Sequence, residues 1–168
     1  PPRPDFALRV VPSSLNVRGG ASVPLTVYAL RRDGFTNEIT LALQDAPTGF
    51  KLTGAKVPAN QDQVRLTLMA PPEPTEEPLR LSLEGRALVQ GHAVLHPAVP
   101  AEDMMQAFAY RHLVPATELD VVVSGRFMNR MPLKILSATP VKIPAGGTAR
   151  VRVGAPSSAF ADRFRLEL

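Results

Sequence analysis

Hydrophobic and polar residues alternate along the first half of the chain. In a strand, neighbouring side chains point to opposite faces, so such alternation predicts one face on a core and the other in water. This arrangement is typical of antiparallel sheets. The segments that predict such strands are residues 6–10, 25–29, 39–43, 64–68 and 79–83.

Turn-forming residues separate these segments. Gly-Gly at residues 19–20 and Asp-Gly at residues 33–34 lie between the first three, and a polar, proline-rich loop at residues 71–78 lies between the last two. Such residues adopt the backbone conformations that turns require. We expect one further strand over residues 87–95. Short strands at this spacing predict an all-β sandwich.

The second half of the chain repeats the first in the same order. Phe-Ala-Leu-Arg at residues 6–9 recurs as Phe-Ala-Tyr-Arg at residues 108–111. Ordered self-similarity indicates two copies of one structural unit. We therefore expect two tandem antiparallel β-sandwiches, residues 1–98 and residues 99–168, the second shorter or incomplete, with the junction near residues 97–100. Further matches join residues 23–27 to 131–135, 64–71 to 149–156 and 79–83 to 164–168.

The segment after this junction permits two interpretations. Residues 101–106 begin with Ala-Glu-Asp, and Arg111-His112 follow, a charge order that favours a helix. The repeat instead makes residues 108–114 a strand. We expect a strand from about residue 107, preceded by a turn or one short helical turn over residues 101–106.

The amino-acid composition excludes several classes of protein. Hydrophobic residues make up 45% of the 168 residues, enough for a core, and there is no Cys for disulfides or thiolate-bound metals. No apolar run approaches the ~20 residues of a membrane helix, so no membrane insertion is expected. The net charge of +4 is well below that of a dedicated nucleic-acid binder, and no nucleic-acid partner is expected.

Residues 6–50 carry a recognisable pattern. Phe-x-Leu-x-Val-x-Pro-x-x-Leu-x-Val-x-x-Gly is followed by Leu-Thr-Val, Arg-x-Asp-Gly-Phe, Ile-Thr-Leu-x-Leu and Ala-Pro-Thr-Gly-Phe. This pattern resembles the bacterial immunoglobulin-like modules of large secreted or surface proteins, including those appended to glycosidases and peptidases. Residues 101–115 resemble a segment of planctomycete-type exported proteins. The resemblance implies immunoglobulin-like sandwiches, an extracytoplasmic location (periplasm, cell surface or medium) and no catalytic residues.

Motifs for catalysis or cofactor binding are missing from the sequence. It has no glycine-rich phosphate loop, no Gly-x-Ser-x-Gly and no His-Glu-x-x-His, and no cofactor is expected. On a strand His92 and His96 would lie ~13 Å apart, too far to share a metal. Glu102 and Asp103 form an acid pair beside the junction. They are a candidate Ca²⁺ site, with a solvated turn pair as the alternative.

Few aromatic rings remain for ligand stacking. There is no Trp, and the alternation places Phe6, Phe108 and Phe164 toward the core. The rings expected to be exposed are those of Tyr28, Tyr110, Phe35 and Phe127, of which Tyr110 is a candidate binding residue.

Arginines alternate with hydrophobic residues near the end of the chain. Arg150 and Arg152 share one face of a predicted strand, and Arg163 and Arg165 share one face of another. If these strands pair, the four side chains form a candidate site for an anionic polymer with salt-sensitive contacts. The alternatives are two separate strands on opposite sheets, a solvated face balanced by acids, or a face covered by another strand or domain.

These observations favour a non-catalytic spacer or interaction module within a larger exported bacterial protein, not an enzyme. The alternative is a binding module for glycan or anionic polymer that uses the arginine-rich face of the second domain. The expected partners are neighbouring domains of the same polypeptide and cell-surface polysaccharide. A shortened second sandwich leaves an open strand edge, so a strand-exchanged dimer is a further expectation.

Overall fold

The structure of the protein is a computed structural model that describes residues 3–106, 110–126, 134–138, 141–143 and 145–154. Among those residues it is all-β, with no helix. The chain divides into two compact units, Pro1–Phe127 (unit 1) and Met128–Leu168 (unit 2). The strands of unit 1 are β1 (Asp5–Val11), β2 (Ser14–Gly19), β3 (Ser22–Arg32), β4 (Ile39–Gln44), β5 (Lys51–Thr53), β6 (Lys56–Val57), β7 (Gln63–Met69), β8 (Leu79–Val89), β9 (His92–Gln106), β10 (Tyr110–Pro115) and β11 (Leu119–Arg126).

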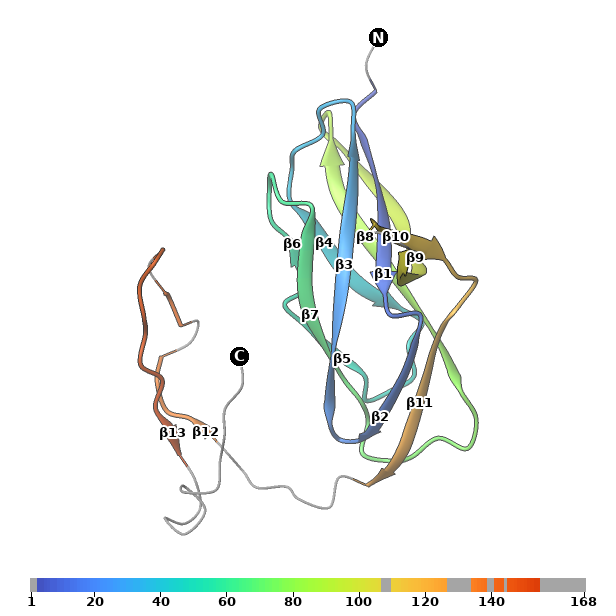
Figure 1. Cartoon of the computed structure of the whole chain (residues 1–168), viewed down its shortest axis with the longest axis vertical. Helices are drawn as coiled ribbons and strands as arrows, with labels where there is room; N and C mark the ends of the chain where they lie inside the picture. The colour runs from blue at the N-terminus through green and yellow to red at the C-terminus, as the bar shows by residue number, and fades with distance from the viewer. Residues whose placement is uncertain (1–2, 107–109, 127–133, 139–140, 144, 155–168) are drawn as a thin grey trace. The chain divides into compact units, whose positions relative to one another are not determined.

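The strands of unit 1 form one large mixed sheet of 11 strands (Figure 1). Its main path runs β2-β11-β8-β9-β1-β3-β7-β5, while β10 pairs with β9, and β4 pairs with β8 and β6. Two pairings are parallel, β1 with β9 and β2 with β11. The sheet folds over on itself, so β1, β3, β7 and β5 form a first layer that faces a second layer of β2, β11, β8, β4 and β6.

Strand β9 joins the two layers. Its first residues, 92–97, pair with β8 in the second layer. Its middle residues, 98–100, pair with β1 in the first layer, and residues 101–106 pair with β10. One long strand therefore passes from one layer to the other and continues into a hairpin beyond the core.

Alternate residues of both layers fill a single hydrophobic core. Leu8, Val27 and Leu66 contribute from the first layer, while Ile39 and Leu83 contribute from the second. No polar or charged residue is buried among the residues that the structure describes. Each large aliphatic side chain removed from water contributes about 1.5–3 kcal/mol, so this core is the main source of stability. All five strands predicted from the alternation are confirmed, as parts of β1, β3, β4, β7 and β8.

Two tight turns have a positive φ at both central residues. Asp33 and Gly34 have φ of 48° and 80°, and the Phe35 N–H donates to the Arg32 carbonyl. Gln90 and Gly91, with φ of 50° and 84°, join β8 to β9. At Gln90-Gly91 this conformation matches the twist of the paired strands β8 and β9. The prediction of one strand over residues 87–95 is therefore wrong, because its middle is this second turn.

The prediction of a turn or short helical turn over residues 101–106 is also wrong. These residues continue β9 and pair with β10 in an antiparallel register, from Ala101 opposite Pro115 to Gln106 opposite Tyr110. The local charge order favoured a helix, but pairing with a neighbouring strand satisfies the same backbone groups. The strand predicted from about residue 107 is present as β10, although residues 107–109 lie outside the described residues.

Two tandem sandwiches are not shown. The predicted junction at residues 97–100 lies inside β9, and β11 pairs with β2 and β8 of unit 1. Leu119, Val121 and Val123 of β11 are part of the core of unit 1. In unit 2, β12 (Lys134–Ile135) pairs with β13 (Val153–Gly154). The predicted strand at residues 164–168 lies outside the described residues.

Candidate functional site on the outward face of the first layer

The face of the first layer that points away from the core carries one aromatic ring between arginines. Burial of Leu8, Val27 and Leu66 turns their neighbours outward, among them Arg9 of β1 and Tyr28 of β3. Arg9 lies directly opposite Tyr28, while Arg65 of β7 lies opposite Thr26, two residues along β3 from Tyr28. Tyr28 is half-buried and Arg65 is exposed. We call Arg9, Tyr28 and Arg65 the Tyr28 face.

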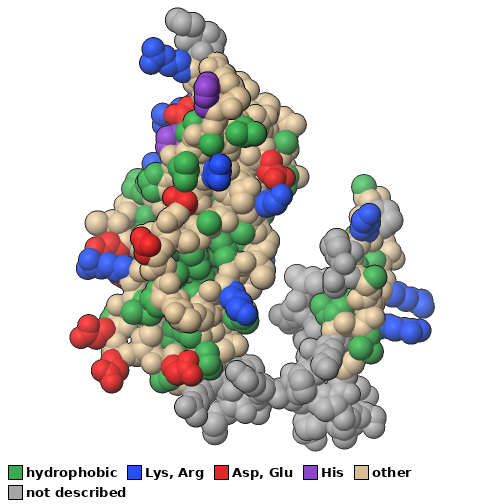
Figure 2. Space-filling model, turned by 180° about the vertical axis from the view of Figure 1, so that it is seen from behind, with side chains coloured by type: hydrophobic (Ala, Val, Ile, Leu, Met, Phe, Trp, Pro, Cys, Tyr) green, Lys and Arg blue, Asp and Glu red, His purple; other side chains and the backbone are tan. Residues whose placement is uncertain are grey.

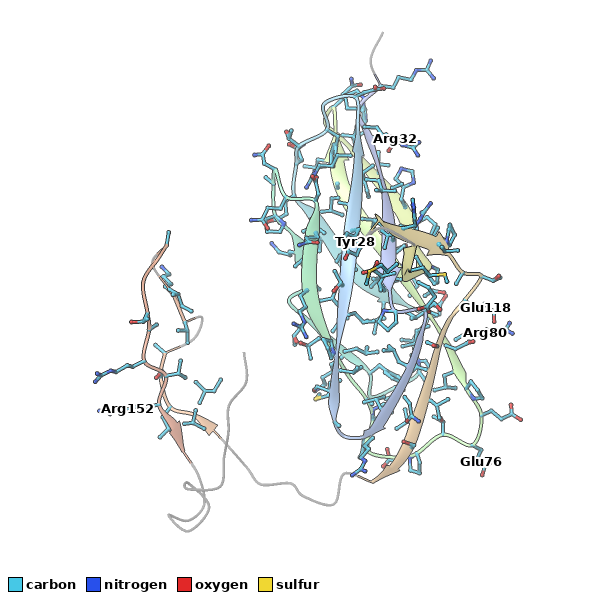
Figure 3. All side chains as sticks on the ribbon, viewed as in Figure 1. Tyr28, Arg32, Glu76, Arg80, Glu118 and Arg152 are labelled. Atoms are coloured by element: carbon cyan, nitrogen blue, oxygen red, sulfur yellow. The ribbon has the colours of Figure 1, made fainter. Side chains whose placement is uncertain are left out.

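An open cleft of about 560 Å³ adjoins this face. Tyr28, Leu30 and Arg32 line it from β3, and Leu113 of β10 lines it from the hairpin that extends β9. Figure 3 labels Tyr28 and Arg32 along β3. Leu30 keeps 41% of its surface exposed, so an apolar side chain borders the ring in the cleft.

The charges of the Tyr28 face are not matched by carboxylates. Among the residues that the structure describes, no carboxylate lies within 4.0 Å of the guanidinium of Arg9 or Arg65. One nitrogen of Arg9 donates to the Leu8 carbonyl at 3.1 Å, which restrains the side chain. The acid that lines the cleft, Asp62, lies 3.5 Å from Nε of Arg31. The face therefore has a net positive character.

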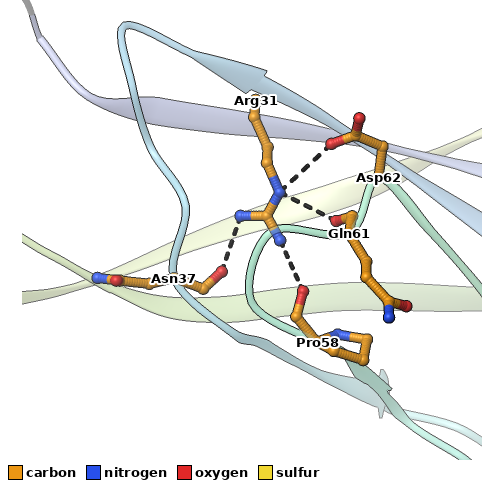
Figure 4. A network of polar contacts seen from close by, with 5 residues as sticks. All are labelled: Arg31, Asn37, Pro58, Gln61 and Asp62. Atoms are coloured by element: carbon orange, nitrogen blue, oxygen red, sulfur yellow. Dashed lines mark hydrogen bonds and ion pairs between the residues drawn. The ribbon is translucent and has the colours of Figure 1, made fainter.

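Arg31 positions the loop that carries Asp62 (Figure 4). Its side chain is only 11% exposed. Its nitrogens donate to three carbonyls, those of Asn37, Pro58 and Gln61, at 2.8, 3.0 and 3.0 Å. The guanidinium also lies 5.2 Å from the centroid of the Phe35 ring. A charged donor held by three carbonyl acceptors fixes the loop at the edge of the cleft.

A second polar pair, His96 and Asp5, joins β9 to the start of β1. Nε2 of His96 lies 2.7 Å from Oδ1 of Asp5, which also accepts a hydrogen bond from the Phe6 N–H at 2.8 Å. The His96 ring meets the Phe6 ring edge to face at 4.9 Å, and Phe6 stacks on Phe35 at 5.2 Å. These contacts tie β9 to the start of β1. They give the pair a structural role in joining the layers.

The pKa of Asp5 lies below its ordinary value of 3.8. The largest cause is the hydrogen bond from the Phe6 N–H, and the next is the hydrogen bond with His96. The positive charge of Arg32 adds to this effect. The ionised carboxylate therefore stabilises the fold above pH 3.8, and this contribution is lost as the pH falls through the lowered pKa. We expect Asp5→Asn to destabilise unit 1 at neutral pH and to lose this effect in acid. Urea unfolding of both proteins between about pH 5 and about pH 2 measures it. A difference that stays constant over this range would contradict the assignment.

The predicted calcium ligands are not brought together. Glu102 and Asp103 are successive residues of β9, so their side chains leave opposite faces of the strand. The Glu102 carboxylate accepts hydrogen bonds from the Ser13 N–H, at 3.0 Å, and from the Ser13 hydroxyl. Among the described residues no three His, Asp or Glu side chains are grouped to hold a metal ion. The Ca²⁺ site stays a prediction.

The predicted arginine site is only partly within the described residues. Arg150 and Arg152 lie in unit 2, and both are exposed. The backbone of Arg152 pairs with residues 136–137, its N–H donating to the Ser137 hydroxyl at 2.7 Å. Arg163 and Arg165 lie outside the described residues. Tyr110 begins β10 in unit 1, opposite Gln106.

The predicted burial and exposure of the aromatic rings is only partly confirmed. Phe35 is 4% exposed, so its predicted exposure is wrong, because the turn before it directs the ring onto Phe6 in the core. Phe6 is buried as predicted, and Tyr28 is half-buried on the outward face. Phe108, Phe127 and Phe164 lie outside the described residues.

Sequence reasoning did not identify the Tyr28 face. Its three residues occupy polar positions of the alternation, which is a visible signal. Their proximity depends on the register of β1, β3 and β7, which short alternating segments do not determine.

Comparisons with known proteins identify no family. No protein-family model matches the chain, and no curated protein matches it significantly. In the described part of the chain, no helix has the length and hydrophobicity needed to cross a membrane.

Proposed function

We propose that the protein is a non-catalytic interaction module of a larger exported bacterial protein, with unit 1 as an immunoglobulin-like β-sandwich. Two features support this interpretation of unit 1. Its two layers enclose one apolar core, and its first two strands divide between them, β1 pairing with β3 and β2 with β11. The same proposal places the protein outside the cytoplasm, beside neighbouring domains of its own polypeptide.

The observation that carries an interaction role is an exposed apolar patch on the β8–β9 hairpin. Leu88 and Leu95 are 59% and 51% exposed, and Ala93 lies opposite Leu88 in the register. Leu95 lies opposite Arg86, so all three apolar residues share the outward face of the hairpin. Figure 2, which views the molecule from behind, shows hydrophobic side chains at the surface among scattered charges. We call Leu88, Ala93 and Leu95 the hairpin patch.

Self-association tests this role, because two copies of the chain can bury their exposed apolar patches against each other. Sedimentation velocity over a wide range of protein concentrations should show reversible association of the purified chain. The double variant Leu88→Ser, Leu95→Ser should remain monomeric, since apolar burial drives such contacts. The control Thr53→Ser, Thr67→Ser changes two exposed positions of the first layer and should behave as the unmodified chain. A chain that stays monomeric throughout argues against the patch as a contact surface.

A second candidate function is binding of an anionic polymer by unit 2. The exposure of both Arg150 and Arg152 favours it. Arginine binds carboxylate and phosphate through paired hydrogen bonds, and such contacts weaken with salt. The double variant Arg150→Gln, Arg152→Gln separates this site from any site on unit 1.

A further inference from the structure

We propose that the Tyr28 face binds an acidic polysaccharide, with the Tyr28 ring against a sugar ring and Arg9 and Arg65 paired with sugar carboxylates. This site lies on unit 1, and it is distinct from both the hairpin patch and the arginines of unit 2. It does not depend on the role proposed for the hairpin patch.

The first argument is the position of the ring. Tyr28 lies on β3, which has β1 on one side and β7 on the other, so the ring occupies the middle of the layer rather than its edge. Its neighbours across the strands are Arg9 and Gln63, and the open cleft adjoins it. A tyrosine in this position offers a rigid apolar surface and a hydroxyl for hydrogen bonding, both of which suit a sugar ring.

The second argument is the placement of charge. Arg9 and Arg65 lie on the strands that flank β3. Two strand spacings of about 4.8 Å and an offset of two residues along β3 place their backbones about 12 Å apart. Neither has a carboxylate within 4.0 Å among the described residues. A guanidinium without such a partner can bind a ligand carboxylate through two parallel hydrogen bonds.

The same spacing favours a polysaccharide over a nucleic acid. Duplex DNA carries one charge per about 1.7 Å of its axis, and proteins that bind it present dense arrays of cations. The Tyr28 face instead presents separate cations on either side of one ring. A polymer with one carboxylate on every second sugar matches cations placed in this way.

Binding of a short, fluorescently labelled hyaluronan oligosaccharide to the full chain tests the proposal. Fluorescence anisotropy should show binding at low salt that weakens as salt is added. Arg65→Gln and Tyr28→Leu should each weaken binding about tenfold, which is the effect of losing one charged hydrogen bond or a comparable ring contact. The control Arg86→Gln, at an exposed arginine of the second layer, should bind as the unmodified chain does. The double variant Arg150→Gln, Arg152→Gln measures separately any binding by unit 2.

Several outcomes would overturn the proposal. These are no binding at low salt, an equal loss with Arg86→Gln, or a loss confined to the variant of unit 2. Tighter binding of a labelled single-stranded oligonucleotide than of hyaluronan at the same salt would assign the face to nucleic acid instead. Circular dichroism checks the fold of each variant. If Tyr28→Leu is unfolded, Arg65→Gln at its exposed position decides the question.

Discussion

Val121→Asp is expected to destabilise unit 1 as a whole by at least about 4 kcal/mol. Val121 of β11 is fully buried, with Leu15 of β2 on one side and Leu79 of β8 on the other. The substitution removes an apolar side chain from the core and places a carboxyl group there without a partner, at a cost of at least about 4 kcal/mol. Because small domains are stable by only about 5–15 kcal/mol, this cost removes a large part of the free energy of unfolding and should shift the whole transition to much lower urea. Urea unfolding followed by circular dichroism measures the change.

Thr117→Asp is the matched control for this substitution. Thr117 is exposed just before β11, so the same carboxylate there remains in water and should leave the unfolding midpoint nearly unchanged. The experiment also tests the predicted domain boundary between residues 98 and 99. If residues 1–98 folded alone, Val121→Asp would retain a transition at the original midpoint. A surviving transition would contradict the single core described for unit 1.

Gly85→Val is expected to destabilise unit 1 by about 3 kcal/mol. Gly85 is buried in the middle of β8, between Leu41 of β4 and His96 of β9. A Cβ atom there would overlap Cδ1 of Leu8 and lie 2.9 Å from Cγ2 of Ile39. Side chains from both layers would have to move apart, and close-packed cores accommodate such changes poorly. The free energy of unfolding in urea measures this effect.

Ser82→Val controls for the β-branched side chain itself. Ser82 is an exposed residue of the same strand, where valine favours the extended conformation and meets no core atoms. This variant should be as stable as the unmodified chain or slightly more so. A Gly85→Val protein of unchanged stability would mean that the two layers are not packed through this position.

The alternation within each strand shows which residues of the Tyr28 face point outward, but not which of them are neighbours. Arg9, Tyr28 and Arg65 were each identifiable as outward residues, because each alternates with buried neighbours on its own strand. That Arg9 faces Tyr28 follows only from the pairing of β1 with β3. The predicted arginine site uses residues close in sequence, whereas Arg9 and Arg65 are distant in the chain and share one face only through strand pairing.

Residues 87–106 show where local signals failed. The alternation around Ala87 and Leu95 predicts a strand, but Gln90-Gly91 is a weaker turn signal than Asp33-Gly34, so the sequence alone does not indicate the hairpin. The acids at residues 102–103 suggested a helix or turn. Antiparallel pairing with β10, the next strand along the chain, makes them a strand, because it satisfies the backbone groups that a helix would pair internally.

By itself, the sequence determined the all-β class, five alternating strands and the inward residues of those five strands, since these depend on periodicity within each strand. Only the tertiary structure decided which strands pair, that β9 joins the two layers, and that β11 completes the core of unit 1. The physical reason is that pairing and register are set by contacts between distant segments, which short alternating patterns leave almost equally favourable until the core closes.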